Sequence, residues 1–187
     1  MQAVAVRTRE ERIKTLREAF QAIMWMAHRQ FSQRLQTFNL TMPQFVTLAS
    51  LAAHKQSCTM RDLTNVTLHD PPTMTGIVDR LVRMKLVERT RSDADRRVVL
   101  VRATETAVQL VEQIKDEMMN EESNMYAALS DNDLTALERL LKQKLRLYVG
   151  QYRSLPDDDL DVEIENLQRF MKDPIYYTKL ESKTNAP

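Results

Sequence analysis

Five short segments in the middle of the chain follow one another in an order that few folds share. The first three, 43–55, 59–67 and 71–84, place apolar residues three and four positions apart, as amphipathic helices do. The last two, 86–91 and 97–102, are rich in β-branched residues, as strands are. Because a short stretch of Ser and Asp residues separates these two strands, we expect a hairpin with a charged tip.

Three short helices followed at once by a hairpin are the elements of a winged helix-turn-helix module, a DNA-binding variant of the helix-turn-helix. In that module the second helix of the pair enters the major groove, which is about 12 Å wide, while its apolar face stays in the core. We expect residues 71–84 to be this helix. Its predicted inward side chains are Ile77, Val78, Leu81 and Met84. Its predicted outward residues are Thr73, Thr75, Gly76, Asp79, Arg80 and Arg83.

The starts of two of these helices carry capping signals. Asp70 precedes Pro71 and Pro72, which have no N–H, so we expect the Asp70 carboxylate to accept a hydrogen bond from the Thr73 N–H. Thr59 is expected to cap the helix before it. As a cap, Thr59 would present its hydroxyl and a helix amino terminus to a DNA phosphate.

Longer amphipathic helices are expected on both sides of this module. One spans roughly 8–38, a second roughly 104–128, and a third follows a cap at Ser130-Asp131. The side chains predicted to face inward on the third helix are Leu134, Leu137, Leu141, Leu145 and Tyr148. A last amphipathic helix is expected to end at Asp173-Pro174. Residues 175–187 are expected either to be loose or to form a docked tail that Tyr176 and Tyr177 anchor. The predicted fold is mainly α with a small β-hairpin wing, an α+β architecture.

Several classes of chemistry lack the residues that they need. Only two glycines occur, so no Gly-rich phosphate loop is present, and a single cysteine, Cys58, cannot build a cysteine-based zinc site. No nucleophile, base and orienting residue can be grouped from these motifs. No apolar run approaches the roughly 20 residues of a membrane-spanning helix. We therefore expect a cytoplasmic protein that is not an enzyme, uses no cofactor or metal and does not contact a membrane.

Charge is distributed unevenly, although the formal net charge is only +1. Residues 1–103 carry eight more basic than acidic side chains, and residues 104–187 carry seven more acidic than basic ones. Such a polarity is expected if one end of the molecule meets a polyanion. Chance asymmetry among solvated helices is the alternative interpretation.

Four segments carry a resemblance to a known family: LTMPQF at 40–45, DPPTMTGIVDRL at 70–81, LVER at 86–89 and the wing SDADRR at 92–97. With these segments the sequence resembles the MarR family of regulators over roughly residues 10–150. The family's wing is similar to D-x-R at its tip, which matches Asp95 and Arg97. The resemblance implies a transcriptional regulator that binds double-stranded DNA as a homodimer, with a ligand crevice between its dimer and DNA-binding regions.

The resemblance also implies a domain organisation. The long helices at 1–40 and 104–152 would form the helical dimerisation region, and 41–103 would be the winged helix-turn-helix domain. Residues 153–187 lie outside the common family core as a helical extension, whose apolar stripe we expect to pack across the dimer.

The DNA-binding residues implied by the resemblance lie on the recognition helix and the wing. Pro72, Thr73, Thr75 and Gly76 match positions at the major groove, and Arg97 matches the residue that reads the minor groove. We expect Arg96 to lie beside Arg97, with Asp95 orienting one of them through a charged pair. Thr59 and Arg80 complete the predicted set. A solvated hairpin tip is the alternative for the two arginines.

Three positions depart from the family pattern. Lys85 and Ala107 stand where the family usually has glycines, and a non-glycine residue in a left-handed cap costs about 1 kcal/mol. Gly76 often corresponds to an arginine or another long side chain, so the direct base contact made by such a side chain is absent here.

Two groups of residues have competing interpretations. Met24, Trp25 and His28 flank the apolar stripe of the first helix, where they would line a crevice for a small aromatic or phenolic effector or take part in core or dimer packing. Cys58 is either a redox-sensing thiol or an inert one. A winged helix that contacts protein instead of DNA is the second class of function, and its binding would not weaken steeply with salt.

Overall fold

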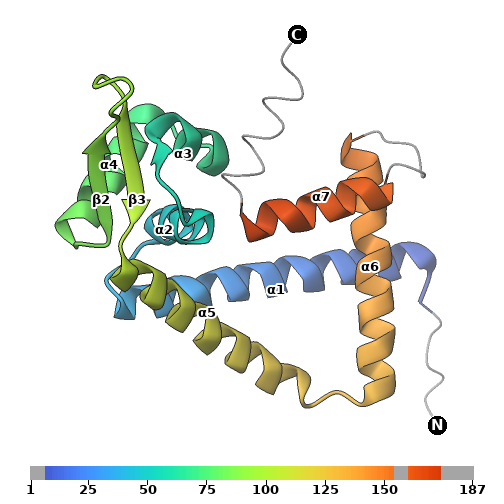
Figure 1. The fold of residues 1–187 in the computed structure, drawn as a ribbon. Helices are drawn as coiled ribbons and strands as arrows, with labels where there is room; N and C mark the ends of the chain where they lie inside the picture. The colour runs from blue at the N-terminus through green and yellow to red at the C-terminus, as the bar shows by residue number, and fades with distance from the viewer. Residues whose placement is uncertain (1–6, 154–159, 174–187) are drawn as a thin grey trace. The chain divides into compact units, whose positions relative to one another are not determined.

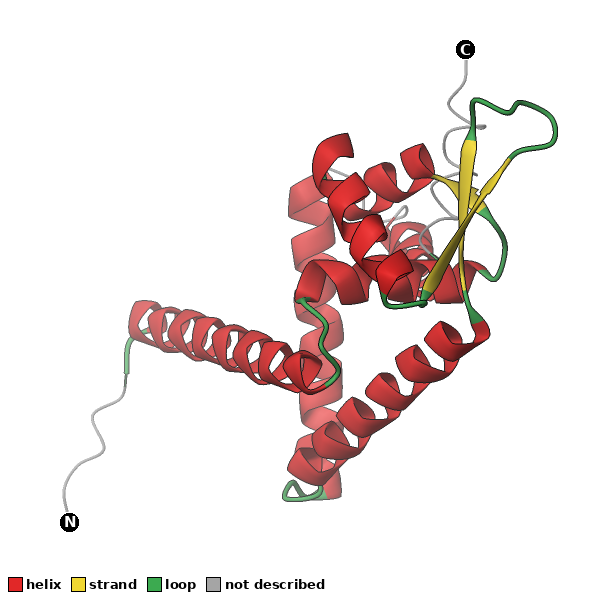
Figure 2. Cartoon of the chain, turned by 90° about the vertical axis from the view of Figure 1, so that its left-hand side faces the viewer, coloured by secondary structure: helices red, strands yellow, loops and turns green. Residues whose placement is uncertain are grey.

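The computed structural model describes residues 7–153 and 160–173 and divides the chain into two compact units, Met1–Met42 and Pro43–Pro187. The predicted tail contact of Tyr176 and Tyr177 lies outside the described residues. None of the helices described here is both long enough and apolar enough to cross a membrane. The described chain is mainly helical, with one small antiparallel sheet (Figure 2). The predicted fold class is confirmed.

The first unit consists of one long helix, α1, from Arg9 to Thr37, as the apolar spacing predicts (Figure 1). Thr8 caps its start in a reciprocal pair of hydrogen bonds with Glu11. The apolar side chains along most of its length are exposed, among them Ile13, Leu16, Phe20 and Ile23.

The second unit contains the predicted three short helices and the hairpin. These elements are α2 (Met42–His54), α3 (Met60–Thr67), α4 (Pro71–Arg83), β2 (Val87–Arg91) and β3 (Val99–Ala103). β2 and β3 pair antiparallel with Arg89 opposite Val101, and the hairpin extends beyond the helices (Figure 2). The strands begin one or two residues later than predicted, and the connecting loop is correspondingly longer.

A two-residue strand, β1 (Cys58–Thr59), was not predicted. It pairs with the other side of β3, so the sheet has the order β1-β3-β2. Two residues show no periodicity, and only the pairing with β3 identifies them as a strand. β1 leads directly into α3, so the sheet fixes the position of the first helix of the helix-turn-helix pair.

The core of this module is built from one side of each element. Leu48 on α2, Leu63 on α3 and Val101 on β3 are buried, together with the predicted Ile77, Val78 and Leu81 on α4. Met74 is also fully buried, one turn before the predicted stripe begins, whereas Met84 is only half-buried. Met74 lies three and four residues before two predicted core positions, so the same spacing extends to it.

Three further helices complete the described chain: α5 (Glu105–Tyr126), α6 (Asp131–Arg153) and α7 (Leu160–Lys172). Thr104 caps α5, and the Ser130 hydroxyl accepts a hydrogen bond from the Asp133 N–H at the start of α6. The inward stripe predicted for α6 is wrong for the single chain. Leu137 is half-buried, and the exposed members of the stripe are Leu134, Leu141, Leu145 and Tyr148. Periodicity identifies the apolar face of a helix but not what covers it.

Candidate nucleic-acid interface

The start of α4 is held by Asp70. The Thr73 N–H donates to Asp70 Oδ1 at 2.7 Å, and Pro71 and Pro72 occupy the first two helical positions, as predicted. The hydrogen bonds from Thr73, with a smaller contribution from the charge of His69, hold the pKa of Asp70 below its ordinary value of 3.8. A carboxylate is stabilised at this end of a helix because unpaired N–H groups gather there. Asp70 thus fixes the start of α4, the expected recognition helix.

The lowered pKa of Asp70 predicts how stability changes in acid. A carboxyl group whose pKa is lower in the folded state than in the unfolded state stabilises the folded state. This stabilisation is fully present at pH values above the pKa of the unfolded state, and it is lost as the pH falls through the pKa of the folded state. We expect Asp70→Asn, which keeps a good cap without a charge, to lose less stability than the parent protein on going from pH 5 to pH 2. Thermal unfolding followed across this range measures the difference, and parallel pH profiles for the two proteins would contradict the assignment.

The outward face of α4 is small and open near its start. The predicted residues Pro72, Thr73, Thr75 and Gly76 are all exposed, and so is Arg80 one turn further on. No atom lies within 4 Å of the position that a Cβ on Gly76 would take. The Thr75 hydroxyl donates to the Pro71 carbonyl at 2.8 Å and therefore stays close to the helix. This face allows another molecule to approach the backbone of α4.

The tip of the hairpin carries the second predicted group. The Asp95 carboxylate accepts from the Arg97 N–H at 2.9 Å and from the Arg97 side-chain Nε at 3.4 Å. The charged pair predicted for Asp95 is therefore present. The Arg97 side chain is 93% exposed, and Arg96 is exposed beside it, with its carbonyl accepting from Arg91. The tip thus presents two guanidinium groups to solvent on a short, internally bonded loop.

An ion pair that the sequence did not predict joins α4 to the hairpin. Arg89 on β2 donates to Asp79 on α4 at 2.5 Å. Nothing in a spacing of ten residues distinguishes this pair from other oppositely charged residues, and only the fold brings the two side chains together. The contact ties the outward side of the recognition helix to the strand that leads to the tip.

The end of α4 is closed by a residue in a left-handed conformation. Lys85 has φ 60°, its N–H donates to Val82, and the next residue, Leu86, donates back to Leu81. This is the position at which the resemblance expects a glycine, so the chain accepts backbone strain there. Ala107, the other departure, lies in the first turn of α5, is buried and has no positive φ.

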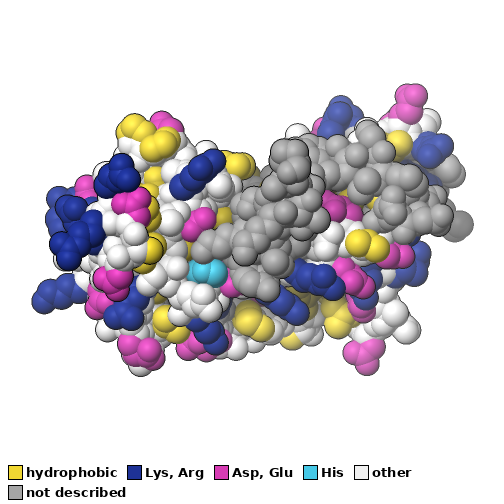
Figure 3. All heavy atoms as spheres, turned by 45° about the horizontal axis from the view of Figure 1, so that its top comes forward, with side chains coloured by type: hydrophobic (Ala, Val, Ile, Leu, Met, Phe, Trp, Pro, Cys, Tyr) yellow, Lys and Arg dark blue, Asp and Glu magenta, His cyan; other side chains and the backbone are white. Residues whose placement is uncertain are grey.

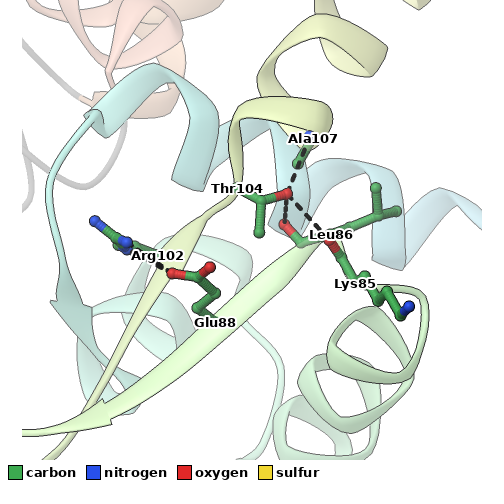
Figure 4. A network of polar contacts seen from close by, with 6 residues as sticks. All are labelled: Lys85, Leu86, Glu88, Arg102, Thr104 and Ala107. Carbon is green, nitrogen blue, oxygen red and sulfur yellow. Dashed lines mark hydrogen bonds and ion pairs between the residues drawn. The ribbon is translucent and has the colours of Figure 1, made fainter.

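Thr104 joins the end of α4 to the start of α5. Its hydroxyl lies 3.1 Å from the Lys85 carbonyl and 3.3 Å from the Leu86 carbonyl, and the same oxygen accepts from the Ala107 N–H at 3.3 Å (Figure 4). Nearby, Arg102 donates to Glu88 at 2.9 Å across the base of the hairpin. These contacts couple the recognition helix to the long helix that leaves the module.

Thr59 has the predicted capping role, but its surroundings differ from those expected for a phosphate contact. The Thr59 hydroxyl accepts from the Asp62 N–H at 3.2 Å, and the Asp62 carboxylate accepts from the Thr59 N–H at 2.8 Å. An acidic side chain thus already occupies part of the helix start where a phosphate was expected. A Thr followed three residues later by an acidic side chain, as in Thr59 and Asp62, is the sequence pattern that indicates this reciprocal pair of hydrogen bonds.

Basic side chains lie on this part of the surface together with acidic ones. Figure 3 shows a group of Lys and Arg side chains at the edge where Figure 1 places α4 and the hairpin, with Asp and Glu side chains among them and further Lys and Arg side chains elsewhere on the visible face. A cleft of about 640 Å³ opens at the base of the hairpin. Its lining includes Leu51, Lys55, Glu88, Arg102, Glu105 and Val108. Among the residues that the structure describes, no three His, Cys, Asp or Glu side chains are grouped closely enough to hold a metal ion.

The residues with two interpretations lie in different environments. On α1, Met24, Trp25 and His28 are exposed, and the Arg29 guanidinium lies 5.4 Å from the centre of the Trp25 ring. Cys58 is only 1% exposed and pairs with Val101 in the sheet. Because thiol oxidation requires access and thiolate character, the burial of Cys58 opposes a sensing role.

Comparisons with known proteins point to one family. A sequence model of the MarR family matches residues 38–98. The HTH-type transcriptional repressor NicR of Pseudomonas putida is 38% identical over 82 residues, which are 44% of this chain and 51% of NicR. The chain therefore spans about half the length of NicR. The HTH-type transcriptional regulator MgrA of Staphylococcus aureus is 28% identical over 113 residues, which are 59% of this chain and 74% of MgrA.

The fold leads to the same family. A mutant of MepR from Staphylococcus aureus superposes with a TM-score of 0.66 at 26% sequence identity, covering 68% of this chain and 94% of that chain. The matched sequence region contains α2, α3, α4 and β2, which carry most of the helix-turn-helix geometry described above. By sequence over residues 38–98 and by fold, the chain is similar to the MarR family of winged helix-turn-helix regulators.

Proposed function

We propose that the protein is a transcriptional regulator that binds double-stranded DNA as a homodimer on a pseudo-palindromic operator. The observation that carries the proposal is the joint presentation of the open face of α4 and the exposed Arg97 tip, linked by the Asp79–Arg89 ion pair. A helix with small residues at its start fits a major groove, and guanidinium groups on a wing fit a neighbouring minor groove. The relative NicR is named a repressor, and we propose repression here.

In this proposal the DNA contacts divide by groove. Pro72, Thr73, Thr75 and Gly76 lie at base edges of the major groove, with Arg80 reaching the flanking backbone. Arg96 and Arg97 enter the minor groove, and Asp95 keeps Arg97 oriented before binding. The Asp62 carboxylate occupies the start of α3, so we assign the Thr59 hydroxyl at most a weak phosphate contact, made by donating its own hydrogen. Gly76 lacks a side chain that could read a base, so we assign it the role of permitting close approach.

Apolar surface that the single chain leaves uncovered supports the proposed homodimer. Leu134, Leu141 and Leu145 on α6 are exposed, as are several apolar residues on α1. Contiguous exposed apolar surface marks interaction sites because its burial is favourable by roughly 25 cal/mol per Å². We propose that 1–40 and 104–152 form the dimer region. Two copies would then place their recognition helices about one helical turn of DNA apart.

Release by a small molecule is the regulatory part of the proposal. The exposed indole of Trp25, with Met24 and His28 beside it on α1, suits a small aromatic or phenolic effector. Such a ligand lowers operator affinity only if it binds more tightly to a dimer whose recognition helices are misaligned with the grooves.

Selection of bound sequences from a random duplex DNA pool tests the proposed function. We expect enrichment of an inverted repeat whose half-sites have centres about 10 base pairs apart. Gel-shift titration of the enriched site should give affinity that falls steeply as salt rises, since phosphate contacts release counterions. A protein that enriches no sequence and binds no duplex at low ionic strength would refute the proposal.

A winged helix that binds protein is the second candidate, and one observation favours it. Leu68, in the turn between α3 and α4, is 89% exposed and has a left-handed φ of 56°. An apolar partner that covers Leu68 would bind with little dependence on salt. The salt titration above therefore separates the two candidates.

A further inference from the structure

We propose that α7 is an intramolecular strap. It bridges α2, in the winged helix-turn-helix module, and α6, and so restrains the orientation of the module relative to α6. This inference goes beyond DNA binding and does not depend on it. It concerns α7, the described part of the extension 153–187, whose apolar stripe the sequence analysis expected to pack across the dimer. Three contacts on the two ends of α7 carry the proposal.

The first end of α7 is packed on α6. Leu160, the first residue of α7, is buried, and its side-chain methyls lie 3.4 and 3.6 Å from the position that a Cβ on Gly150 would take. A Cβ at this position would make ordinary van der Waals contacts with Leu160, so the two helices pack side by side here. Asp161 forms an ion pair with Arg146, one turn before Gly150 on α6. The start of α7 is thus fixed by an apolar and a charged contact.

The far end of α7 reaches the winged helix. Asp173, directly after α7, lies with its Oδ2 3.2 Å from Nδ1 of His54, the last residue of α2. An ionised carboxylate only accepts hydrogen bonds, so His54 Nδ1 carries the proton and donates. The His54 side chain is 5% exposed and that of Asp173 is 27% exposed. A hydrogen bond to a charged group with little solvent access is stronger than one at the surface.

The contacts at the two ends of α7 form a second, non-covalent connection between the module and α6. Along the chain, the module connects to α6 through Thr104 and α5. Through space, α2 connects to α6 by way of α7. Two connections allow the module and α6 fewer relative orientations than one connection does, because the second restricts the rotations that the first leaves free. The strap therefore narrows the range of orientations between the winged helix and α6.

The experiment measures that range directly in the full chain. Spin labels are attached after Arg83→Cys on α4 and Arg139→Cys on α6, both at exposed positions, while the buried Cys58 is left in place. Labelled chains are diluted into an excess of unlabelled chains, so that distances within one chain are recorded by double electron–electron resonance. We expect one narrow distance distribution in the parent protein and a broader or split distribution in Asp173→Asn.

The matched control is Glu165→Gln, which also removes one carboxylate from α7 but affects only an ion pair with Arg169 on the same helix among the contacts described here. It should leave the distribution narrow. Amide hydrogen exchange in the last turn of α2 should be faster by about fivefold in Asp173→Asn and unchanged in the control. An Asp173→Asn distribution as narrow as that of the parent, or equal broadening in both variants, would overturn the proposal.

Discussion

Arg97→Ala is expected to weaken operator binding by about 1 to 3 kcal/mol, which is roughly 5-fold to 150-fold in affinity. The Arg97 side chain is 93% exposed and contributes to no buried core, so its removal should act on binding and not on folding. Its backbone N–H is held by Asp95 at 2.9 Å, which orders the tip before DNA arrives. An ordered guanidinium loses less conformational freedom on binding than a mobile one.

The control for this prediction is Arg169→Ala on α7. Arg169 is also an exposed arginine next to a carboxylate, that of Glu165, but it lies outside the predicted DNA-binding set. Gel-shift titration of the three proteins on the selected operator, with thermal unfolding to verify equal stability, separates a wing contact from a general loss of charge. If Arg97→Ala and the parent protein bound the operator with equal affinity, the assignment of the wing to the DNA interface would be wrong.

The same variant distinguishes a contact with phosphate from a contact in the minor groove. A guanidinium that only neutralises phosphate lowers affinity about equally for all sequences when it is removed. One that enters a narrow minor groove is favoured by A·T-rich flanks, where the negative potential is enhanced. We expect the loss caused by Arg97→Ala to be larger on operators with A·T-rich flanks, because the hairpin places this residue at its tip.

The parts of the fold that the sequence predicted well are those determined by neighbouring residues. The cap at Asp70 follows from the two prolines after it, which leave the Thr73 N–H as the first available donor. The limits of α1 and α4 follow in the same way from apolar spacing and capping residues. The strained position at Lys85 was identified from the resemblance alone, since spacing carries no information about φ.

The parts that the sequence did not predict depend on contacts between distant residues. The pairing of β1 with β3, the ion pair between Asp79 and Arg89, and the contact between His54 and Asp173 join residues that no local pattern relates. The apolar stripe of α6 was identified correctly as a pattern, but its exposure in the single chain was not foreseen. A pattern shows that a face needs a partner, whereas the fold shows whether the same chain supplies one.

Leu81→Ala is expected to destabilise the winged helix by about 2 to 5 kcal/mol. Leu81 on α4 is 0% exposed, so truncation removes buried methyl groups and leaves a cavity that the surrounding side chains fill only in part. A domain with a typical free energy of unfolding of about 5 to 15 kcal/mol loses a large fraction of its stability in this way. The outward face of α4 is unchanged, so any loss of DNA binding would follow from unfolding.

The matched control is the same substitution at Leu68, which is 89% exposed. Because Leu68→Ala removes the same atoms from solvent-exposed surface and leaves no cavity, its expected effect is within about 0.5 kcal/mol. Urea unfolding of both variants gives the two free energies, and equal slopes of the transitions verify that the same surface is exposed on unfolding. A Leu81→Ala protein as stable as Leu68→Ala would show that α4 does not pack on this core. The recognition helix would then have no fixed orientation from which to enter a groove.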